Sequence, residues 1–238
     1  MTALRLESIS AIRGHGRRAA SVLRDVSLSI EPGQVVMLEG PSGSGKTTLL
    51  AVAGGLLTPA HGGVWLDGVD LWAATPRVQR LVRSRKVGFV FQHSNLLPGL
   101  TVRDNVLLMA GIAGVDRKAA ALTCQDLLEA LEIGRLWDRF PHELSGGEEQ
   151  RAAVARALVH QPAVVLADEP TGSLDSVTGA EVATVLAQLG SSRGTAVLLA
   201  THDQRLRSIA TRRICLRDGA LSELPHAAEE SATGVTRS

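Results

Sequence analysis

Eight residues near the start of the chain have the types and spacing needed to wrap the phosphates of a nucleotide. Residues 40–47 read Gly-Pro-Ser-Gly-Ser-Gly-Lys-Thr and fit the pattern G-x-x-x-x-G-K-[ST]. The glycines let backbone N–H groups turn toward phosphate oxygens, because no Cβ stands in the way. Lys46 can reach the β- and γ-phosphates, and the hydroxyl of Thr47 can bind Mg²⁺. The chain is therefore predicted to bind a nucleoside triphosphate.

The flanking sequence supports this prediction over a plain Gly/Ser-rich turn. Residues 35–38 are apolar like a buried strand, and residues 48–53 are typical of a helix. A helix that starts at the loop places the positive end of its dipole beneath the phosphates. The residues predicted to contact the nucleotide here are Gly40, Pro41, Ser42, Gly43, Ser44, Gly45, Lys46, Thr47 and Thr48.

Two acidic residues, Asp168 and Glu169, follow directly on the apolar run 163–167. A carboxylate at the carboxyl end of a central strand, beside a phosphate loop, can hold Mg²⁺ through water, which fits Asp168. Glu169 then points at the γ-phosphate and can orient or deprotonate the attacking water. The alternative, a pair of solvated turn residues, is the weaker reading once a phosphate loop is present.

His202 and Gln92 also follow strand-like runs, at 196–200 and 87–91. His202 is placed to contact the γ-phosphate, and Gln92 is placed to meet the metal or the water. A lone histidine is more often structural or exposed, and a lone glutamine signals little. Both predictions therefore depend on position at a strand end.

The segment Ser145-Gly146-Gly147 has two compatible interpretations. Ser145, with Glu148 three residues later, forms a capping box for a helix over 146–159. Capping does not explain two glycines in a first turn, because glycine weakens a helix. A glycine-lined helix start with a serine hydroxyl is also what a second anion site needs.

The elements that must position these residues predict an α/β fold with a mainly parallel sheet and flanking helices. The apolar runs 163–167 and 196–200 are typical of central parallel strands covered on both faces. Residues 1–33 are strand-rich, and an N-terminal antiparallel β subdomain is expected there. A helical insertion is expected over 93–158. The leucines expected to share one buried face of the insertion are Leu122, Leu127, Leu128 and Leu131.

Composition limits the function classes. The 238 residues are 45% apolar with a formal charge of +1, so no general attraction to nucleic acid or acidic membranes is expected. The apolar stretch 106–115 is about half the length needed to cross a bilayer. Cys124 and Cys215 form no C-x-x-C and are expected to be buried. The basic run 77–86 is expected to be a solvated helix face, with contact to lipid head groups or a partner's acidic loops as the alternative.

Taken together, these fragments resemble the ATP-binding subunits of ABC transporters. The nucleotide-binding domain is expected over 1–224, followed by a disordered tail over 225–238. The runs 89–98 and 168–175 look like the lipoprotein-release, macrolide-efflux and antimicrobial-peptide group. The shared segments, in the family's order, are the loop 40–47, Gln92, Leu144-Ser145-Gly146-Gly147-Glu148, Asp168-Glu169, Ser173-Leu174-Asp175 and His202.

The resemblance implies a P-loop NTPase core that hydrolyses ATP with Mg²⁺ in a head-to-tail dimer of two copies. Each ATP would lie between the phosphate loop of one copy and Ser145, Gly146 and Gly147 of the other, with Asp175 communicating across the dimer. A separate integral membrane permease would dock on the helical insertion at the cytoplasmic face of the cell membrane, and nucleic acid is not an expected partner. The implied catalytic residues are Glu169, His202, Lys46 and Gln92, and the implied metal-binding residues are Thr47, Gln92 and Asp168.

The sequence departs from the family at two places. Many members stack adenine on an aromatic residue near the N-terminus, but the chain has no tyrosine and reads Ile-Arg-Gly-His-Gly over 12–16. Arg13 or His15 could stack by its flat face, or the base is held loosely, so measurable GTP turnover is predicted. Relatives often carry glutamine at Glu149. This extra carboxylate could oppose dimerisation by like-charge repulsion or face solvent, and solvent is favoured.

Three functions follow from the resemblance. The favoured one is an ATPase that powers a permease for a lipoprotein, a peptide or a hydrophobic compound. The second is a regulatory ATPase whose membrane partner transports nothing. A soluble ATPase acting on DNA or ribosomes is disfavoured, because the chain shows no coiled coil or long linker.

Overall fold

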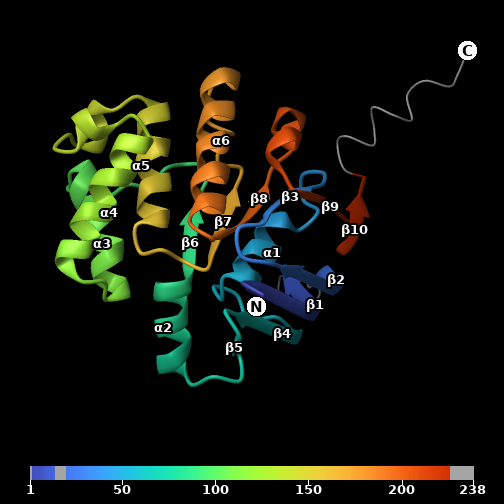
Figure 1. Ribbon diagram of the computed structural model, residues 1–238. Helices are drawn as coiled ribbons and strands as arrows, with labels where there is room; N and C mark the ends of the chain where they lie inside the picture. Colours follow the sequence, from blue (N-terminus) through green and yellow to red (C-terminus); the bar gives the residue numbers. More distant parts are fainter. Residues whose placement is uncertain (1, 14–19, 226–238) are drawn as a thin grey trace, which may run out of the picture.

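The computed structural model describes residues 2–13 and 20–225, which form two β-sheets with flanking helices (Figure 1). The larger sheet has the strand order β10-β9-β3-β8-β7-β6, and neighbouring strands are parallel except β9 and β10. Its strands are β3 (Val35–Glu39), β6 (Val87–Val90), β7 (Val164–Asp168), β8 (Ala196–Ala200), β9 (Arg212–Arg217) and β10 (Ala220–Leu224). The predicted mainly parallel sheet is confirmed. The predicted tail lies outside the described residues from position 226 onward.

The central strands are buried on both faces, and the two faces belong to different cores. Successive side chains of a strand point to opposite sides of the sheet. Val35 and Met37 therefore pack in one core, and Val36 and Leu38 pack in the other. The helices that cover the faces are α1 (Lys46–Ala53), α5 (Gly146–Leu158) and α6 (Ser176–Ser192). Because β3, β6, β7 and β8 run parallel, the loops that follow them leave from the same edge of the sheet.

The smaller sheet is the predicted N-terminal antiparallel unit, with the strand order β2-β1-β4-β5. Its strands are β1 (Leu4–Arg13), β2 (Ala20–Ile30), β4 (His61–Leu66) and β5 (Val69–Asp70). Along β2, Val26, Leu28 and Ile30 are buried, and the residues between them are exposed. This period of two places the apolar face of the sheet in the core that also contains the residues of α1.

The residues between β6 and β7 form a helical layer, which Figure 1 shows on the side of the large sheet away from β1 and β2. The remaining helices are α2 (Pro76–Lys86), α3 (Val102–Ala113), α4 (Arg117–Ala130) and the 3₁₀ turns η2 (Gly134–Leu136), η3 (Pro141–Glu143) and η4 (Gln204–Ile209). Leu127, Leu128 and Leu131 are buried as predicted, but Leu122 is 65% exposed. The prediction for Leu122 is wrong because five residues of helix turn it about 140° away from Leu127.

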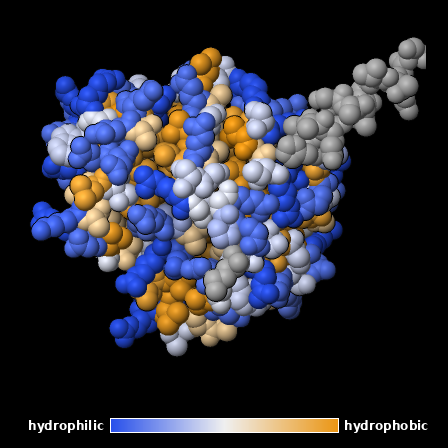
Figure 2. Space-filling model, viewed as in Figure 1, coloured by the Kyte–Doolittle hydropathy of each residue, from blue (hydrophilic) through white to orange (hydrophobic). Residues whose placement is uncertain are grey.

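The basic run forms α2, and it is more than a solvated face. Arg83 donates to the carbonyl of Gly55 (3.1 Å), and Arg85 donates to the carbonyl of Ala113 (3.0 Å). These bonds tie α2 to α1's C-terminal turn and to α3. Figure 2 shows an apolar patch over the region where Figure 1 places α2 and β5. On α2 the exposed apolar side chains are Val78 and Leu81.

Candidate nucleotide site

The phosphate loop lies between β3 and α1, and its backbone requires glycine at three positions. Gly40, Gly43 and Gly45 have φ angles of +150°, +80° and +106°, which L side chains rarely adopt. At Gly40 a Cβ would also lie 2.4 Å from the carbonyl oxygen of Leu216. The side chain of Lys46 folds back over the loop, because its Nζ donates to the carbonyl of Gly40 (2.8 Å).

The start of α1 has the donors that a triphosphate requires. Its N-cap, Gly45, makes no side-chain capping bond, and the first N–H groups of a helix have no acceptor inside the helix. The Oγ of Ser44 is buried, and it has no hydrogen-bond partner among the described residues. Thr47 is exposed, whereas Thr48 is buried. Open N–H groups, an ammonium and hydroxyls together fit a nucleotide's phosphates and their metal.

Asp168 and Glu169 lie at the same sheet edge as the phosphate loop. Asp168 ends β7 in register with Ala200 of β8, and β8 is the strand that separates β7 from β3. Glu169 has a φ of +46°, the left-handed region, which is unusual for a residue with a Cβ. Its N–H donates to the carbonyl of Ala200 (2.8 Å), which helps to fix this conformation. Such strain is typical of functional sites.

His202 and Glu169 contact each other directly. The Nδ1 atom of His202 lies 3.0 Å from both carboxylate oxygens of Glu169. The Glu169 side chain is 19% exposed and that of His202 is 77% exposed. The pair therefore lies at the exposed edge of the sheet. There the histidine orients the carboxylate, which remains accessible to solvent.

Gln92 lies in the loop after β6, beside the segment that follows Glu169. The Oγ of Ser173 donates to the Gln92 carbonyl (2.8 Å). A Cβ at Gly172 would lie 3.0 Å from the Gln92 amide nitrogen, so the side chain packs against that segment. The structure thus brings together four of the predicted groups at one edge: the phosphate loop, Gln92, Asp168 with Glu169, and His202.

Ser145, Gly146 and Gly147 lie apart from this edge, at the start of α5. The predicted capping box is present, because Glu148 Oε2 accepts from the N–H and the hydroxyl of Ser145, both at 2.9 Å. Hydrogen bonding from the Ser145 N–H is the largest of the effects that lower the pKa of Glu148. Within the described ranges no hydrogen bond joins residues 145–147 to the phosphate loop.

Asp175 caps α6 and lies near α5 rather than in the loop that holds phosphate. Its carboxylate accepts from the N–H groups of Val177 (3.0 Å) and Thr178 (3.1 Å). The hydrogen bond from the Thr178 side chain contributes most to lowering the pKa of Asp175. A Cβ at Gly147 would lie 2.5 Å from the Thr178 methyl, so glycine there lets α5 and α6 approach closely.

Glu149 does not simply face solvent, so that expectation is corrected. Its carboxylate accepts a 2.7 Å hydrogen bond from Ser94, a buried residue of the loop that carries Gln92. Arg156 holds the same loop, donating to the carbonyls of Ser94 and Asn95, both at 2.7 Å. Ser94 and Arg156 were not predicted, because nothing local in the sequence marks a side chain that hydrogen-bonds to a distant part of the chain.

A charge cluster around the buried Arg213 lies directly behind the phosphate loop. Glu39, the last residue of β3, accepts from Arg213 (2.8 Å) and Arg207 (2.8 Å). Burial alone would raise the pKa of Glu39, but the hydrogen bonds from the two guanidinium groups outweigh it and lower that pKa. The cluster joins the start of the phosphate loop to β9 and to η4, which follows His202.

The region expected to hold the base is only partly described. Arg13 ends β1 and is exposed, whereas His15 lies outside the described residues. The side chain of Ile12 is 56% exposed. The described part of this region therefore offers an aliphatic surface and one guanidinium, with no aromatic ring.

Comparison with known proteins tests the resemblance. Residues 23–172 match the family model described as ABC transporter. The chain is 39% identical to the lipoprotein-releasing system ATP-binding protein LolD of Shewanella frigidimarina, over 98% of this chain and 96% of that protein. It is 40% identical to the macrolide export ATP-binding/permease protein MacB of Syntrophobacter fumaroxidans, over 93% of this chain but only 31% of that longer protein.

Solved structures give the same answer for the fold. The dimeric structure of a post-hydrolysis state of the ATP-binding cassette MJ0796, bound to ADP and Pi, superposes with a TM-score of 0.81 at 34% identity. The match covers 93% of this chain and 99% of that chain. The predicted family and fold are confirmed. The chain therefore belongs to the ABC transporter family, as an ATP-binding and ATP-hydrolysing cassette.

Proposed function

We propose that this cassette works as a head-to-tail dimer that energises a separate membrane permease. The observation that carries the proposal is the division of the site between two places in one copy. The phosphate loop and the glycine-lined start of α5 both have the chemistry to bind anions, yet they do not meet within the chain. A second copy, inverted against the first, supplies residues 145–147 to the phosphates held by residues 40–47. The dimeric state named for the MJ0796 structures supports this arrangement.

Each site residue then has a distinct role in ATP hydrolysis. Lys46 and the N–H groups of the loop neutralise the phosphates, and Thr47, Asp168 and Gln92 would hold Mg²⁺ directly or through water. The metal, when bound, supplies charge neutralisation at the β- and γ-phosphates. Glu169 orients the attacking water and takes its proton.

His202 and the signature residues complete the same pocket. The contact between His202 and Glu169 keeps the carboxylate aimed at the water while the imidazole faces the γ-phosphate. The partner's Ser145, Gly146 and Gly147 close the pocket over the nucleotide, and Asp175 links the two sites across the dimer. The charge that develops on the transferred phosphoryl group is thus met by fixed donors on both sides.

The division of the chain into parts follows this scheme. We assign residues 1–224 to the nucleotide-binding domain and residues 93–158 to the module on which the permease docks. Within the part of the chain that the structure describes, no helix is both long enough and apolar enough to span a bilayer. We assign the membrane-spanning part to another chain because LolD, which this chain matches over 96% of that protein's length, is named as the ATP-binding protein of a lipoprotein-releasing system. We place the cassette at the cytoplasmic face of the cell membrane.

The names of the relatives suggest the class of cargo. LolD is named for lipoprotein release and MacB for macrolide export, which favours export or extraction of a lipoprotein, peptide or hydrophobic compound. A regulatory ATPase whose partner transports nothing shares the same chemistry. A flux assay with the reconstituted complex separates the two functions.

Capture from membranes tests the proposal. Tagged Glu169→Gln protein is incubated with solubilised native membranes, with and without ATP, and Lys46→Ala protein serves as the control that binds ATP poorly. We expect one integral membrane protein, enriched by ATP with Glu169→Gln and not with Lys46→Ala. Recovery of no membrane protein, together with an intact ATP-dependent dimer, would instead indicate a soluble ATPase.

A further inference from the structure

Glu149, which stands where relatives often carry glutamine, has no role in the site described above. Its carboxylate accepts a 2.7 Å hydrogen bond from the hydroxyl of Ser94, a residue that is 9% exposed. A hydroxyl that donates to a carboxylate at this distance forms one of the stronger hydrogen bonds found in proteins. Because Ser94 lies two residues after Gln92, this bond ties Glu149 to the loop whose glutamine is assigned to the metal.

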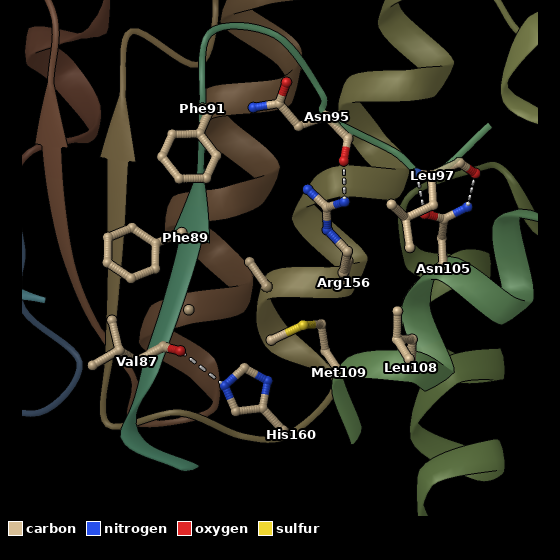
Figure 3. Close-up of a pocket in the computed structure, with 12 residues that line it drawn as sticks. Val87, Phe89, Phe91, Asn95, Leu97, Asn105, Leu108, Met109, Arg156 and His160 are labelled. Carbon is tan, nitrogen blue, oxygen red and sulfur yellow. Dashed lines mark hydrogen bonds between the residues drawn. The ribbon is translucent and has the colours of Figure 1, made fainter. Parts of the chain in front are cut away.

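Two other side chains of α5 hold the backbone of the same loop. The Nε2 atom of Gln150, a residue that is 1% exposed, donates to the carbonyl of Phe91 (2.8 Å). Arg156 donates to the carbonyls of Ser94 and Asn95, both at 2.7 Å. Figure 3 shows Arg156 reaching from α5 to the Asn95 carbonyl. The loop is therefore attached to α5 at both of its ends.

Of these three α5 side chains, that of Glu149 comes from the first turn of the helix. The Glu149 N–H donates to the carbonyl of Ser145 (2.9 Å), so the acceptor of the Ser94 hydroxyl and the glycine-lined helix start belong to one turn. In the proposed dimer, this turn binds the phosphates that the other copy holds. A shift of the turn is passed to Ser94 through a single hydrogen bond.

On its other side, Gln92 is held by the segment that follows Glu169. The hydroxyl of Ser173 donates to the Gln92 carbonyl (2.8 Å), and a Cβ at Gly172 would lie 3.0 Å from the Gln92 amide nitrogen. The loop is thus held by α5 and by this segment at the same time. Because of this double attachment, a displacement of Ser94 moves the Gln92 amide relative to Glu169.

We propose that Glu149 is a positioning residue, which sets the place of the Gln92 amide through Ser94 when the first turn of α5 binds the other copy's phosphates. The inference rests on the proposed function, because it needs the dimer and the role of Gln92 at the metal. Phosphate bound to residues 145–147 of one copy then adjusts Gln92 in that copy's own ATP site. Loss of the bond uncouples the two sites without removing a group that touches nucleotide.

Substitutions at both ends of the hydrogen bond test the proposal. Glu149→Ala and Ser94→Ala each remove the bond, whereas Glu149→Gln keeps an acceptor of nearly the same shape. Glu181→Ala is the matched control, because the Glu181 carboxylate also accepts from an α5 side chain, that of Arg151 (3.0 Å), but joins α5 to α6.

Turnover and ATP affinity are measured for each variant. We expect kcat to fall about tenfold in both alanine variants, as for loss of one hydrogen bond to a charged group. The double variant should be no slower than either single one, because the two residues act through one contact. Glu149→Gln and Glu181→Ala should keep most of the turnover. The ATP affinity of the monomer depends on the phosphate loop and should stay that of wild type in every variant.

Mixed dimers separate coupling from a general loosening of α5. A dimer with one Glu169→Gln copy has one site that cleaves ATP, and cleavage is followed in a single turnover. With Glu149→Ala on the copy that keeps Glu169, the altered Gln92 lies in the cleaving site, and we expect cleavage to slow about tenfold. With Glu149→Ala on the Glu169→Gln copy, the rate should match that of the mixed dimer without Glu149→Ala.

Several results would overturn the proposal. Equal slowing in the two mixed dimers would mean that a distorted phosphate-binding turn explains the loss. Normal turnover by Ser94→Ala would show that the hydrogen bond does not act on Gln92. Turnover by Glu149→Gln as low as that by Glu149→Ala would show that the charge matters and the hydrogen bond does not. If the wild-type protein forms no ATP-dependent dimer, the proposed function fails first, and this inference fails with it.

Discussion

Replacing Glu39 by glutamine should destabilise the protein far more than the same replacement of an exposed glutamate that also forms an ion pair with an arginine. The Glu39 carboxylate is shared by Arg207 and Arg213, and the Arg213 side chain is 1% exposed against 14% for Glu39. Glu39→Gln removes a negative charge that two guanidinium groups share, and one of them, that of Arg213, is taken out of water. Removing one partner of a buried ion pair costs about 3 kcal/mol or more. For a chain of this size that corresponds to a fall in Tm of roughly 6–12 °C.

An ion pair with exposed side chains serves as the control for this prediction. Arg5 and Glu7 form an ion pair at 2.9 Å, almost the same distance, but their side chains are 45% and 50% exposed. Glu7→Gln should therefore cost about 0–1 kcal/mol. Both variants are compared with wild type by urea unfolding followed by circular dichroism. A loss below about 1 kcal/mol for Glu39→Gln would refute the reasoning that burial makes this pair decisive.

The pH dependence of the difference gives an independent check. The folded state lowers the pKa of Glu39 below its ordinary 4.5, so the stabilisation is fully present above that pH. It is lost as the pH falls through the lower, folded-state value. The gap in stability between wild type and Glu39→Gln should therefore be constant from about pH 6 to 8 and shrink below pH 4.5. A gap that widens in acid contradicts the assignment.

Three further predictions concern the loop, a thiol and the base. Gly40→Ala should weaken ATP binding about tenfold or more, because φ is +150° and the new Cβ would lie 2.4 Å from the Leu216 carbonyl oxygen. Gly43→Ala, whose Cβ meets nothing within 4 Å, should weaken binding less. Calorimetric titration that finds weaker binding for Gly43→Ala than for Gly40→Ala would contradict this prediction. Burial raises the pKa of the Cys124 thiol to about 11, so Cys124 should resist a thiol reagent at pH 7.5 while the partly exposed Cys215 reacts. Equal labelling of the two cysteines in the folded protein would show that the core around Cys124 opens. GTP should be hydrolysed measurably, because no aromatic ring selects adenine in the described part of the base region; a preference for ATP above a hundredfold, in parallel assays, contradicts this.

Most of the fold could be predicted because its signals are local. The sequences of β3, β7 and β8 are nearly continuous apolar runs. A strand that is covered on both faces of a sheet needs apolar residues at almost every position. The capping box at Ser145 and the glycines of the phosphate loop act within a few residues. Parallel pairing then brings Asp168, Glu169 and His202 to one edge without any information about tertiary packing.

The remaining features depend on contacts between distant parts of the chain. The Ser94–Glu149 bond joins residues 55 apart, and whether a carboxylate meets solvent or a buried hydroxyl depends on how α5 packs against the loop. The left-handed backbone of Glu169 is likewise imposed by its neighbours and not by its residue type. Leu122 differs for a local reason, because its spacing from Leu127 places it on another side of α4, where it is exposed.

The most direct test of the account is ATP turnover by Glu169→Gln, measured together with ATP retention and dimer formation. Because Glu169 is assigned to the attacking water and not to phosphate binding, the variant should keep ATP bound and form the dimer. Its turnover should fall by roughly 10²–10⁴-fold relative to wild type. Near-normal turnover would contradict the assignment of Glu169 and, with it, the chemistry proposed for this sheet edge.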